Sequence, residues 1–354
     1  MMIKKAIRVF FFLILLSSNT YALIEIDITE GNREPLPIAI TNFFYDDNSS
    51  KNLDQVSIDI SKVISADLER SGLFRSIDQE AFIQKTASMH IRPRHGDWRL
   101  INAQALVTGE LTIEKDKLRV EFRLWDTFAE KEIEALVLIT TIDNWRRISH
   151  MIADKIYERL TGEEGYFDTR ILYVSESGPK NNRVKKLAIM DQDSFNHRYL
   201  TSGKELVLTP RFNPVKQEIT YLSYFKNLPR VYLLDIQTGI QEVVGDFPGM
   251  TFAPRFSPEG DKIIMSLARD GNSDIYVMDL KSRVVERLTD SPAIDTSPSY
   301  SPDGKKITFN SDRGGSQQIY VMDNKGRNQK RISRGTGNYA TPVWSPRGDL
   351  IAFT

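Results

Sequence analysis

Alternating apolar and polar residues occur in short stretches through the second half of the chain, separated by turn residues. In Lys306–Phe309 the apolar side chains fall at every second position, which predicts a strand with one buried face. The preceding Ser301–Gly304 has the composition of a tight turn, because proline presets φ, aspartate accepts backbone hydrogen bonds and glycine adopts a positive φ. Further strands are predicted at Pro298–Tyr300, Gln318–Met322 and Arg331–Ser333. This stretch is therefore predicted to hold four antiparallel strands.

The four-stranded unit recurs at a constant interval of 44 residues, without an insertion. Six columns of matching residues keep this register: Phe212, Phe256, Tyr300 and Trp344; Asp191, Asp235, Asp279 and Asp323; Tyr232, Tyr276 and Tyr320; Leu200, Val244, Leu288 and Ile332; Pro210, Pro254, Pro298 and Pro342; Ile219, Ile263, Ile307 and Ile351. Units of four strands and roughly 40–45 residues are typical of β-propeller blades. We therefore expect the tyrosine, isoleucine and phenylalanine columns to pack between neighbouring blades, as part of a scaffold.

The segment between residues 23 and 165 has a different pattern. Apolar residues at helical spacing in Asn52–Phe74 and Asn144–Gly162 predict two helices, each ended by a glycine. Strands are predicted at Leu36–Phe43, Ala105–Glu114 and Leu118–Asp126. We therefore expect a two-domain protein that combines the α+β and all-β classes: a small α/β domain over residues 23–165 and a β-propeller over residues 166–354.

The first 22 residues resemble neither domain. A basic start, "MMIKKAIR", is followed by the apolar run "VFFFLILL" and by the small and polar residues "SSNTYA". This order predicts a secretory signal peptide over residues 1–22, cleaved after Ala22, because the apolar run is too short to cross a bilayer as a helix. Loss of Lys4, Lys5 and Arg8 takes the formal charge from 0 to −3, which argues against a nucleic-acid partner.

The sequence contains no recognisable catalytic, metal or cofactor motif. It has no cysteine, which excludes thiolate catalysis and cysteine-based zinc sites, and it has no G-x-S-x-G, H-E-x-x-H, phosphate-loop or dinucleotide-binding pattern. His90 and His95 fall in an irregular polar stretch, and His150 is expected on a solvated helix face. The periodic Asp279 and Asp323 end strands and are expected to bind backbone N–H groups. We therefore predict no enzymatic activity, no cofactor and no metal.

Three loops stand out because they differ while the strands around them repeat. "FPGMTFA" precedes Pro254, "SPAIDTS" precedes Pro298 and "GTGNYAT" precedes Pro342. In a propeller these loops enter the innermost strands and surround one mouth of the central channel. Variable loops on a constant scaffold are typical of binding sites, and Met and aromatic residues are enriched in interface cores. We therefore interpret them as a protein-binding surface; the alternative is that they are solvated turns.

The repeat stretches "AP-FSP-G", "GN-DIYVMDL", "IDT-P-YSPDGKKI-F-SDRGG-QQIY-MD" and "P-WSP-GD-IAFT", together with "GYFDTRILYVSE" at the domain junction, resemble the TolB family of the Tol–Pal system. The resemblance covers the chain after the signal peptide and is most specific over residues 249–354. It implies a periplasmic binding protein without catalysis. It also implies a six-bladed propeller and an N-terminal domain similar in fold to anticodon-binding domains, without their RNA function.

The resemblance further implies two partner sites. The lipoprotein Pal, with which colicins compete in some bacteria, is expected at the channel mouth, on Met250, Thr251, Ala253, Asp295, Thr296, Tyr339 and Ala340. The C-terminal domain of TolA is expected on the N-terminal strip Leu23, Ile24, Glu25, Ile26 and Asp27. That strip alternates apolar and acidic residues, as suits a segment that adds to a sheet edge. Pal binding is expected to change whether the strip is free.

The remaining expectations concern the length of the chain and two alternative functions. From Phe167 onward the chain holds 188 residues, a little over four units, and it stops at "IAFT" within a unit; we interpret this as C-terminal truncation of a six-bladed protein. A propeller that assists a hydrolase and a sugar- or metal-binding propeller stay open as alternatives. The metal or sugar site would need a ring of carboxylates in the channel loops, where only Asp295 is present.

Overall fold

The structure is a computed structural model that describes residues 23–26, 34–46, 53–84, 92–225, 228–245, 247 and 250–354. For Phe225 and for residues 250–253 it describes the backbone only. The predicted signal peptide with Ala22, as well as Asp27 and His90, lies outside these residues. The chain divides into two compact units, Met1–Thr169 and Arg170–Thr354. Among the described residues, no helix has the length and apolar character needed to span a membrane.

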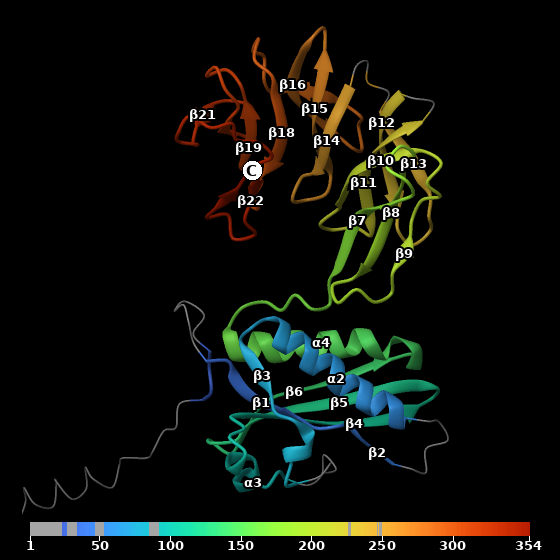
Figure 1. Cartoon of the computed structure of the whole chain (residues 1–354), viewed down its shortest axis with the longest axis vertical. Helices are drawn as coiled ribbons and strands as arrows, with labels where there is room; N and C mark the ends of the chain where they lie inside the picture. Colours follow the sequence, from blue (N-terminus) through green and yellow to red (C-terminus); the bar gives the residue numbers. More distant parts are fainter. Residues whose placement is uncertain are drawn as a thin grey trace, which may run out of the picture. The chain divides into compact units, whose positions relative to one another are not determined.

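The N-terminal unit is a mixed sheet with helices (Figure 1). Its strands are β1 (Leu36–Ile40), β2 (Phe44–Tyr45), β3 (Phe74–Ser76), β4 (Ala105–Glu114), β5 (Lys117–Asp126) and β6 (Lys131–Thr140). Its helices are α2 (Asp54–Arg70), α3 (His95–Leu100) and α4 (Trp145–Thr161), with two 3₁₀ turns at Gln79–Ala81 and Ile142–Asn144. The sheet order is β3-β1-β4-β5-β6, and β2 pairs with β4. Strand β1 is parallel to both of its neighbours, whereas β4, β5 and β6 form an antiparallel meander.

Both faces of this sheet are covered. Ile38 and Ile40 of β1 belong to the main core, which the apolar faces of α2 and α4 complete. Ala39, between them, belongs to a second cluster with Trp98 of α3 and Trp125 of β5. Alternate side chains of one strand thus enter opposite cores, which explains why every residue of β1 is buried. The two predicted helices are confirmed, and Gly72 and Gly162 follow their ends with positive φ.

Two histidine predictions for this unit are wrong. His150 does not lie on a solvated face: it is buried on α4, and its Nδ1 lies 2.5 Å from Oδ2 of Asp67 on α2. His95 does not lie in an irregular loop: it begins α3 and is buried, with its ring 5.8 Å from that of Trp125. In both cases a polar neighbourhood in the sequence suggested exposure, but the partner that buries the ring comes from a distant element. Strand β6 was also not predicted.

The described residues of the second unit form five antiparallel sheets, which we number as blades one to five (Figure 1). Blade one contains β7 (Arg170–Ser177), β8 (Val184–Asp191) and β9 (Arg198–Tyr199). Blade two contains β10 (Leu206–Phe212), β11 (Glu218–Phe225), β12 (Leu228–Asp235) and β13 (Gln241–Gly245). Blade three contains β14 (Met250–Phe256), β15 (Lys262–Arg269), β16 (Asn272–Asp279) and β17 (Val285–Arg287). Blade four contains β18 (Asp295–Tyr300), β19 (Lys306–Ser311), β20 (Gln318–Asp323) and β21 (Lys330–Arg331), and blade five contains β22 (Val343–Trp344) and β23 (Ile351–Ala352).

The repeat columns do pack between neighbouring blades, as predicted. One cluster joins blades one and two, with Ile219 and Tyr221 at its centre; another joins blades two and three around Ile263; a third joins blades three and four around Ile307 and Phe309. The first strands also contact one another in order, β7 with β10, β10 with β14, β14 with β18 and β18 with β22. The predicted fold class, a small α/β domain followed by propeller blades, is therefore confirmed.

The polar columns hold the turns of each blade in the same way. The carboxylate of Asp279 accepts N–H groups from Lys281 and Ser282, and that of Asp323 accepts N–H groups from Lys325 and Arg327, as predicted. The bond from the backbone of Ser282 contributes most to holding the pKa of Asp279 below its usual value. These aspartates therefore act as turn caps, each within its own repeat.

Candidate protein-binding surface

The three loops singled out in the sequence all enter the first strands of their blades at the same end. Met250, Thr251 and Ala253 lie in the first half of β14, Asp295 and Thr296 begin β18, and Tyr339 and Ala340 lie in the loop before β22. Because β14, β18 and β22 are successive neighbours, these positions form one row along the mouth of the blades. The structure thus brings the seven predicted residues to equivalent places in three consecutive blades, although for Met250, Thr251 and Ala253 only the backbone is described.

The first strands of blades two, three and four each carry a bulge at the repeated proline. The pairing register shifts between Leu208 and Arg211 in β10, and in the same way in β14 and β18. The residue before the proline has a positive φ in three repeats: 49° at Thr209, 55° at Ser297 and 52° at Thr341. A left-handed conformation is unfavourable for residues other than glycine, and especially for β-branched threonine. The mouth is therefore built on a strained backbone feature that the neighbouring strands hold in place.

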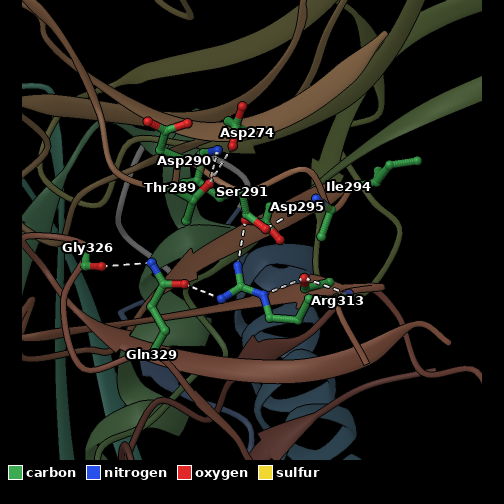
Figure 2. A network of polar contacts seen from close by, with 12 residues as sticks. Asp274, Thr289, Asp290, Ser291, Ile294, Asp295, Arg313, Gly326 and Gln329 are labelled. Carbon is green, nitrogen blue, oxygen red and sulfur yellow. Dashed lines mark hydrogen bonds and ion pairs between the residues drawn. The ribbon is translucent and has the colours of Figure 1, made fainter. Parts of the chain in front are cut away.

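A buried ion pair fixes the loop of blade four at this mouth (Figure 2). The Asp295 side chain is fully buried, and its Oδ2 accepts a hydrogen bond from Nη2 of Arg313 at 2.8 Å. Nε of Arg313 donates to Oγ of Ser311 at 2.9 Å, and its Nη1 donates to Oε1 of Gln329. Its guanidinium also lies over the rings of Phe309 and Tyr320, 5.4 and 5.0 Å from their centroids. Asp295 therefore holds a framework residue, and its carboxylate is not presented to solvent.

The neighbouring predicted residues are more accessible. Thr296 is half-buried, and its Oγ1 accepts a hydrogen bond from Nδ2 of Asn310 at 2.7 Å. Tyr339 is half-buried against Phe353, with ring centroids 5.3 Å apart, and its N–H donates to the carbonyl of Gln317 at 2.8 Å. Ala340 exchanges backbone hydrogen bonds with Thr354. The loops before β18 and β22 are thus tied to blades four and five, which suits a surface that is formed before a partner arrives.

Two arginines that sequence reasoning did not single out lie further along the first strands. Arg211 of β10 and Arg255 of β14 occupy the same position in consecutive blades. Burial, together with the positive charge of Arg211, lowers the pKa of Arg255 to about 10, so Arg255 stays charged at neutral pH. Among the described residues neither guanidinium has a carboxylate partner. The spacing of one repeat between them was visible in the sequence and would have identified the pair.

The predicted N-terminal strip is docked on the first unit. Ile24 and Ile26 pack against the main core, whereas Leu23 and Glu25 are exposed. The N–H of Ile24 donates to Oδ2 of Asp126 at 2.9 Å, and the N–H of Ile26 donates to the carbonyl of Leu160 at 2.6 Å. The alternation of apolar and acidic residues, noted in the sequence, therefore corresponds to an inward and an outward face.

These features define a class of protein: a small α/β domain joined to propeller blades that present a row of variable loops. A family model of the TolB amino-terminal domain matches residues 24–133, and a model of the TolB β-propeller domain matches residues 157–354. The crystal structure of TolB from Acinetobacter baumannii superposes with a TM-score of 0.79 and is 31% identical, covering 93% of this chain and 79% of that one. The chain belongs to the TolB family.

Two curated relatives agree with this. The Tol-Pal system protein TolB of Pelagibacter ubique (strain HTCC1062) is 64% identical over 250 residues, which are 69% of this chain and 56% of that protein. The Tol-Pal system protein TolB of Paramagnetospirillum magneticum (strain ATCC 700264 / AMB-1) is 58% identical over 230 residues, 65% of this chain and 51% of that protein. The aligned part thus spans about half the length of these relatives.

Proposed function

We propose that the protein is a non-catalytic, periplasmic binding component of the Tol–Pal system. It connects Pal in the outer membrane with TolA in the inner membrane, and it serves outer-membrane invagination at cell division and envelope integrity. The observation that carries this proposal is the row of variable loops on repeated blades, in a chain that matches the TolB family in both units. An exported interaction protein needs such a surface and no reactive group.

The proposed Pal surface consists of Met250, Thr251, Ala253, Asp295, Thr296, Tyr339 and Ala340. In this surface Asp295 is a positioning residue, because its buried carboxylate holds Arg313 and thereby the start of β18. Thr296 is the residue whose side chain we expect to contact Pal directly. Arg211 and Arg255 add positive charge along the adjacent strands, which favours an acidic segment of the partner. A colicin that uses the same surface would compete with Pal.

The proposed TolA site is the strip from Leu23 to Asp27. A segment can add to the edge of a partner's sheet only when its own backbone groups are free. In this structure Ile24 and Ile26 use their N–H groups and their side chains to bind the first unit. TolA binding therefore requires the strip to leave that position. A change that weakens the docked state should raise the apparent affinity for TolA, because more of the protein is then competent to bind.

Calorimetric titration with the soluble domain of Pal from the same genome tests the first site. We expect binding by the exported protein extended to the full length of its relatives, and loss of at least tenfold in affinity for Thr296→Arg, which introduces a bulky charge at the mouth. Gln237→Arg is the matched control, because Gln237 is exposed in the β12–β13 turn at the opposite end of a blade. Equal loss in both variants, or no binding by a folded protein, would overturn the Pal assignment.

Titration with the C-terminal domain of TolA tests the second site. Asp126→Ala removes the carboxylate that holds the N–H of Ile24, so we expect TolA to bind more tightly than to the unmodified protein. Glu25→Lys changes the exposed face of the same strip and should weaken binding. If Asp126→Ala leaves the affinity unchanged while Glu25→Lys weakens it, the strip binds TolA without undocking. The non-catalytic part of the proposal is tested separately by a screen for peptide and ester hydrolysis.

A further inference from the structure

A pocket of about 480 Å³ lies between blades one and two, where the segment before Pro210 enters blade two, next to the row of variable loops of blades three to five. It opens between the segment that follows β9 and one face of blade two. We call it the tyrosine pocket and define it by the five lining residues used below: Glu205, Tyr221, Ser223, Tyr232 and Gln241. The rings of Tyr221 and Tyr232 are stacked, with centroids 5.5 Å apart and planes inclined by 22°. The pocket therefore combines an aromatic wall with a carboxylate, a hydroxyl and an amide.

Three of the polar side chains that line this pocket are not used by the protein itself. In the described part of the chain, the side chains of Glu205, Ser223 and Gln241 make no hydrogen bond and no ion pair. Ser223 is nevertheless almost completely buried. Burial is the main reason why the pKa of Tyr221 is raised, with Tyr232 and Glu205 contributing, so its hydroxyl is neutral at physiological pH. Such convergent unsatisfied groups beside an aromatic surface are typical of a ligand site.

Two repeats further along, the corresponding space is filled. Phe309 and Tyr320 of blade four are stacked in the same way, with centroids 5.8 Å apart and planes inclined by 28°. The guanidinium of Arg313 lies over both rings and donates a hydrogen bond to Ser311. It also donates hydrogen bonds to Gln329 and Asp295 (Figure 2). Blade four thus shows that such an aromatic pair can bind a guanidinium group.

The repeat register matches this example to the tyrosine pocket residue by residue. Two repeats separate Tyr221 from Phe309, Ser223 from Ser311, Tyr232 from Tyr320 and Gln241 from Gln329. The carboxylate comes from a different position, Glu205 in blade two and Asp295 in blade four. The counterpart of Arg313 is Phe225, a residue type that carries no charge. Blade two therefore keeps the groups that surround the guanidinium of Arg313 but has no arginine at the matching position.

At the interface between blades two and three, apolar side chains occupy the corresponding space. There the counterpart of Ser223 is Leu267, which is buried in the apolar cluster, and Phe247 of the preceding loop packs against the same cluster. The residue that matches Phe247 one repeat earlier is Gly203, which has no side chain and precedes Glu205 by two positions. A leucine and a phenylalanine thus occupy one interface, while a serine and a glycine leave the other open. The opening is a property of particular residues and not of the propeller geometry.

We propose that the tyrosine pocket binds a guanidinium group supplied by another molecule, as an arginine side chain of a polypeptide or as free arginine. The two rings provide a cation–π surface, Glu205 provides the opposite charge, and Ser223 and Gln241 accept N–H groups as Ser311 and Gln329 do for Arg313. Arg230 also lines the pocket, so the incoming group is expected on the side of Glu205. For free arginine, Arg230 would face the α-carboxylate.

Calorimetric titration of the purified protein with N-acetyl-arginine methylamide tests the proposal. We expect one equivalent to bind, with the N-acetyl methylamides of citrulline and lysine at least about tenfold weaker, because citrulline lacks the charge and lysine lacks the planar fork. Free L-arginine and the peptide Gly-Arg-Gly distinguish the two sources. Tighter binding of the free amino acid identifies arginine itself, and equal or tighter binding of the peptide identifies a polypeptide.

Four variants locate the site. Glu205→Gln should weaken binding by roughly tenfold, whereas Glu242→Gln, an exposed glutamate on the same blade, should not change it. Ser223→Leu introduces the residue that blade three already carries and should abolish binding without unfolding the protein. Arg313→Ala opens the corresponding space in blade four, and its stoichiometry should rise from one equivalent to two.

Three results would overturn the proposal. One is equal affinity for the arginine and citrulline compounds, and another is no binding by the folded protein. The third is binding that arises only in Arg230→Gln, because Arg230 itself would then be the group that occupies the pocket. None of these results depends on Pal or TolA, so they do not bear on the proposed function.

Discussion

The two units of the chain bury their apolar side chains in different ways. In the N-terminal unit one main core collects residues from α2, α4 and most of the sheet, so that positions far apart in sequence share one interior. Among the described residues of the second unit there is no such common interior: three smaller clusters lie between successive blades, and each uses the same columns one repeat apart. A destabilising substitution should therefore lower the stability of the whole first unit, whereas in the second unit its effect should stay near the substituted blade.

The polar interactions show the same contrast. The buried contact between Asp67 and His150 joins two helices through residues that are 83 positions apart in the sequence. The turn-capping aspartates of the blades, in contrast, bind N–H groups two to four residues away. Local interactions form at little cost in chain entropy and can be repeated, whereas a contact over a long separation requires that much of the unit is already folded.

The largest effect is expected for Asp67→Ala. The Asp67 carboxylate contacts Nδ1 of His150 at 2.5 Å and Nη1 of Arg70 at 3.0 Å, and it is fully buried. Removing one partner of a buried charged contact typically costs about 3–5 kcal/mol in the free energy of unfolding. Urea unfolding is followed by tryptophan fluorescence, which reports mainly on this unit with Trp98, Trp125 and Trp145, and by circular dichroism, which reports on both units. Asp303→Ala, at an exposed turn of blade four, is the control, and a similar small loss in both variants would contradict the contrast.

A second comparison uses two isoleucines without exposed surface, Ile152 in α4 and Ile263 in β15. Replacing either by alanine removes buried apolar volume and should cost about 2–5 kcal/mol. Hydrogen exchange should then distinguish them. We expect Ile152→Ala to lower protection throughout the N-terminal unit, and Ile263→Ala to lower it only in blades two, three and their common interface. Loss of protection in blade one and blade four of the second variant would show that the repeats unfold as one body.

The same difference explains how much of the fold the sequence predicts. The repeat region follows from local signals, because each column states its role several times and the turns at Ser301–Gly304 and its equivalents fix the strands. In the N-terminal unit the helices follow from their apolar spacing, but β6 does not. For His150 and His95 the sequence predicts polar surroundings, because their neighbours in sequence are charged. Their true neighbours, Asp67 and Trp125, lie in other elements and leave no local pattern.

For the candidate surface, the sequence predicts which loops vary but not how their side chains are used. Asp295 stands in a variable loop, which suggested a contact with a partner, yet its carboxylate is buried against Arg313, 18 residues further on. Nothing in either residue alone indicates this pairing. The tyrosine pocket could be recognised only by combining the sequence with the structure. The repeat register identifies the equivalent positions in blades two and four, and the structure shows that the space between the side chains is filled in blade four and open in blade two.

A smaller effect is expected from pH in the N-terminal unit. His95 is buried between α3 and Trp125, near Arg92, Arg99, Asp126 and Glu130, and burial is the main cause that lowers its pKa from 6.5. The unfolded chain therefore binds a proton more readily than the folded one. This contribution to stability is complete above about pH 6.5 and is lost as the pH falls below that value.

Thermal unfolding at pH 7.5 and at pH 5.5 measures this contribution. His95→Phe should show a smaller difference between the two pH values than the unmodified protein, because phenylalanine cannot bind a proton. His197→Gln replaces an exposed histidine of blade one and should behave like the unmodified protein. If all three proteins lose the same stability on acidification, other groups account for the pH dependence.

The smallest effect concerns the strained residues before the repeated prolines. Ser297 has a φ of 55°, a region that glycine enters at little cost, so Ser297→Gly should relieve strain and raise the free energy of unfolding by up to about 1 kcal/mol. Ser299→Gly, in the paired part of the same strand, should lower it by roughly 0.5–1 kcal/mol, because glycine there only adds freedom to the unfolded chain. Opposite signs at two positions of β18, measured by urea unfolding, would show that the bulge at the mouth stores strain. If both variants are destabilised, the neighbouring strands already accommodate Ser297 without strain, and the mouth is as relaxed as the rest of its blade.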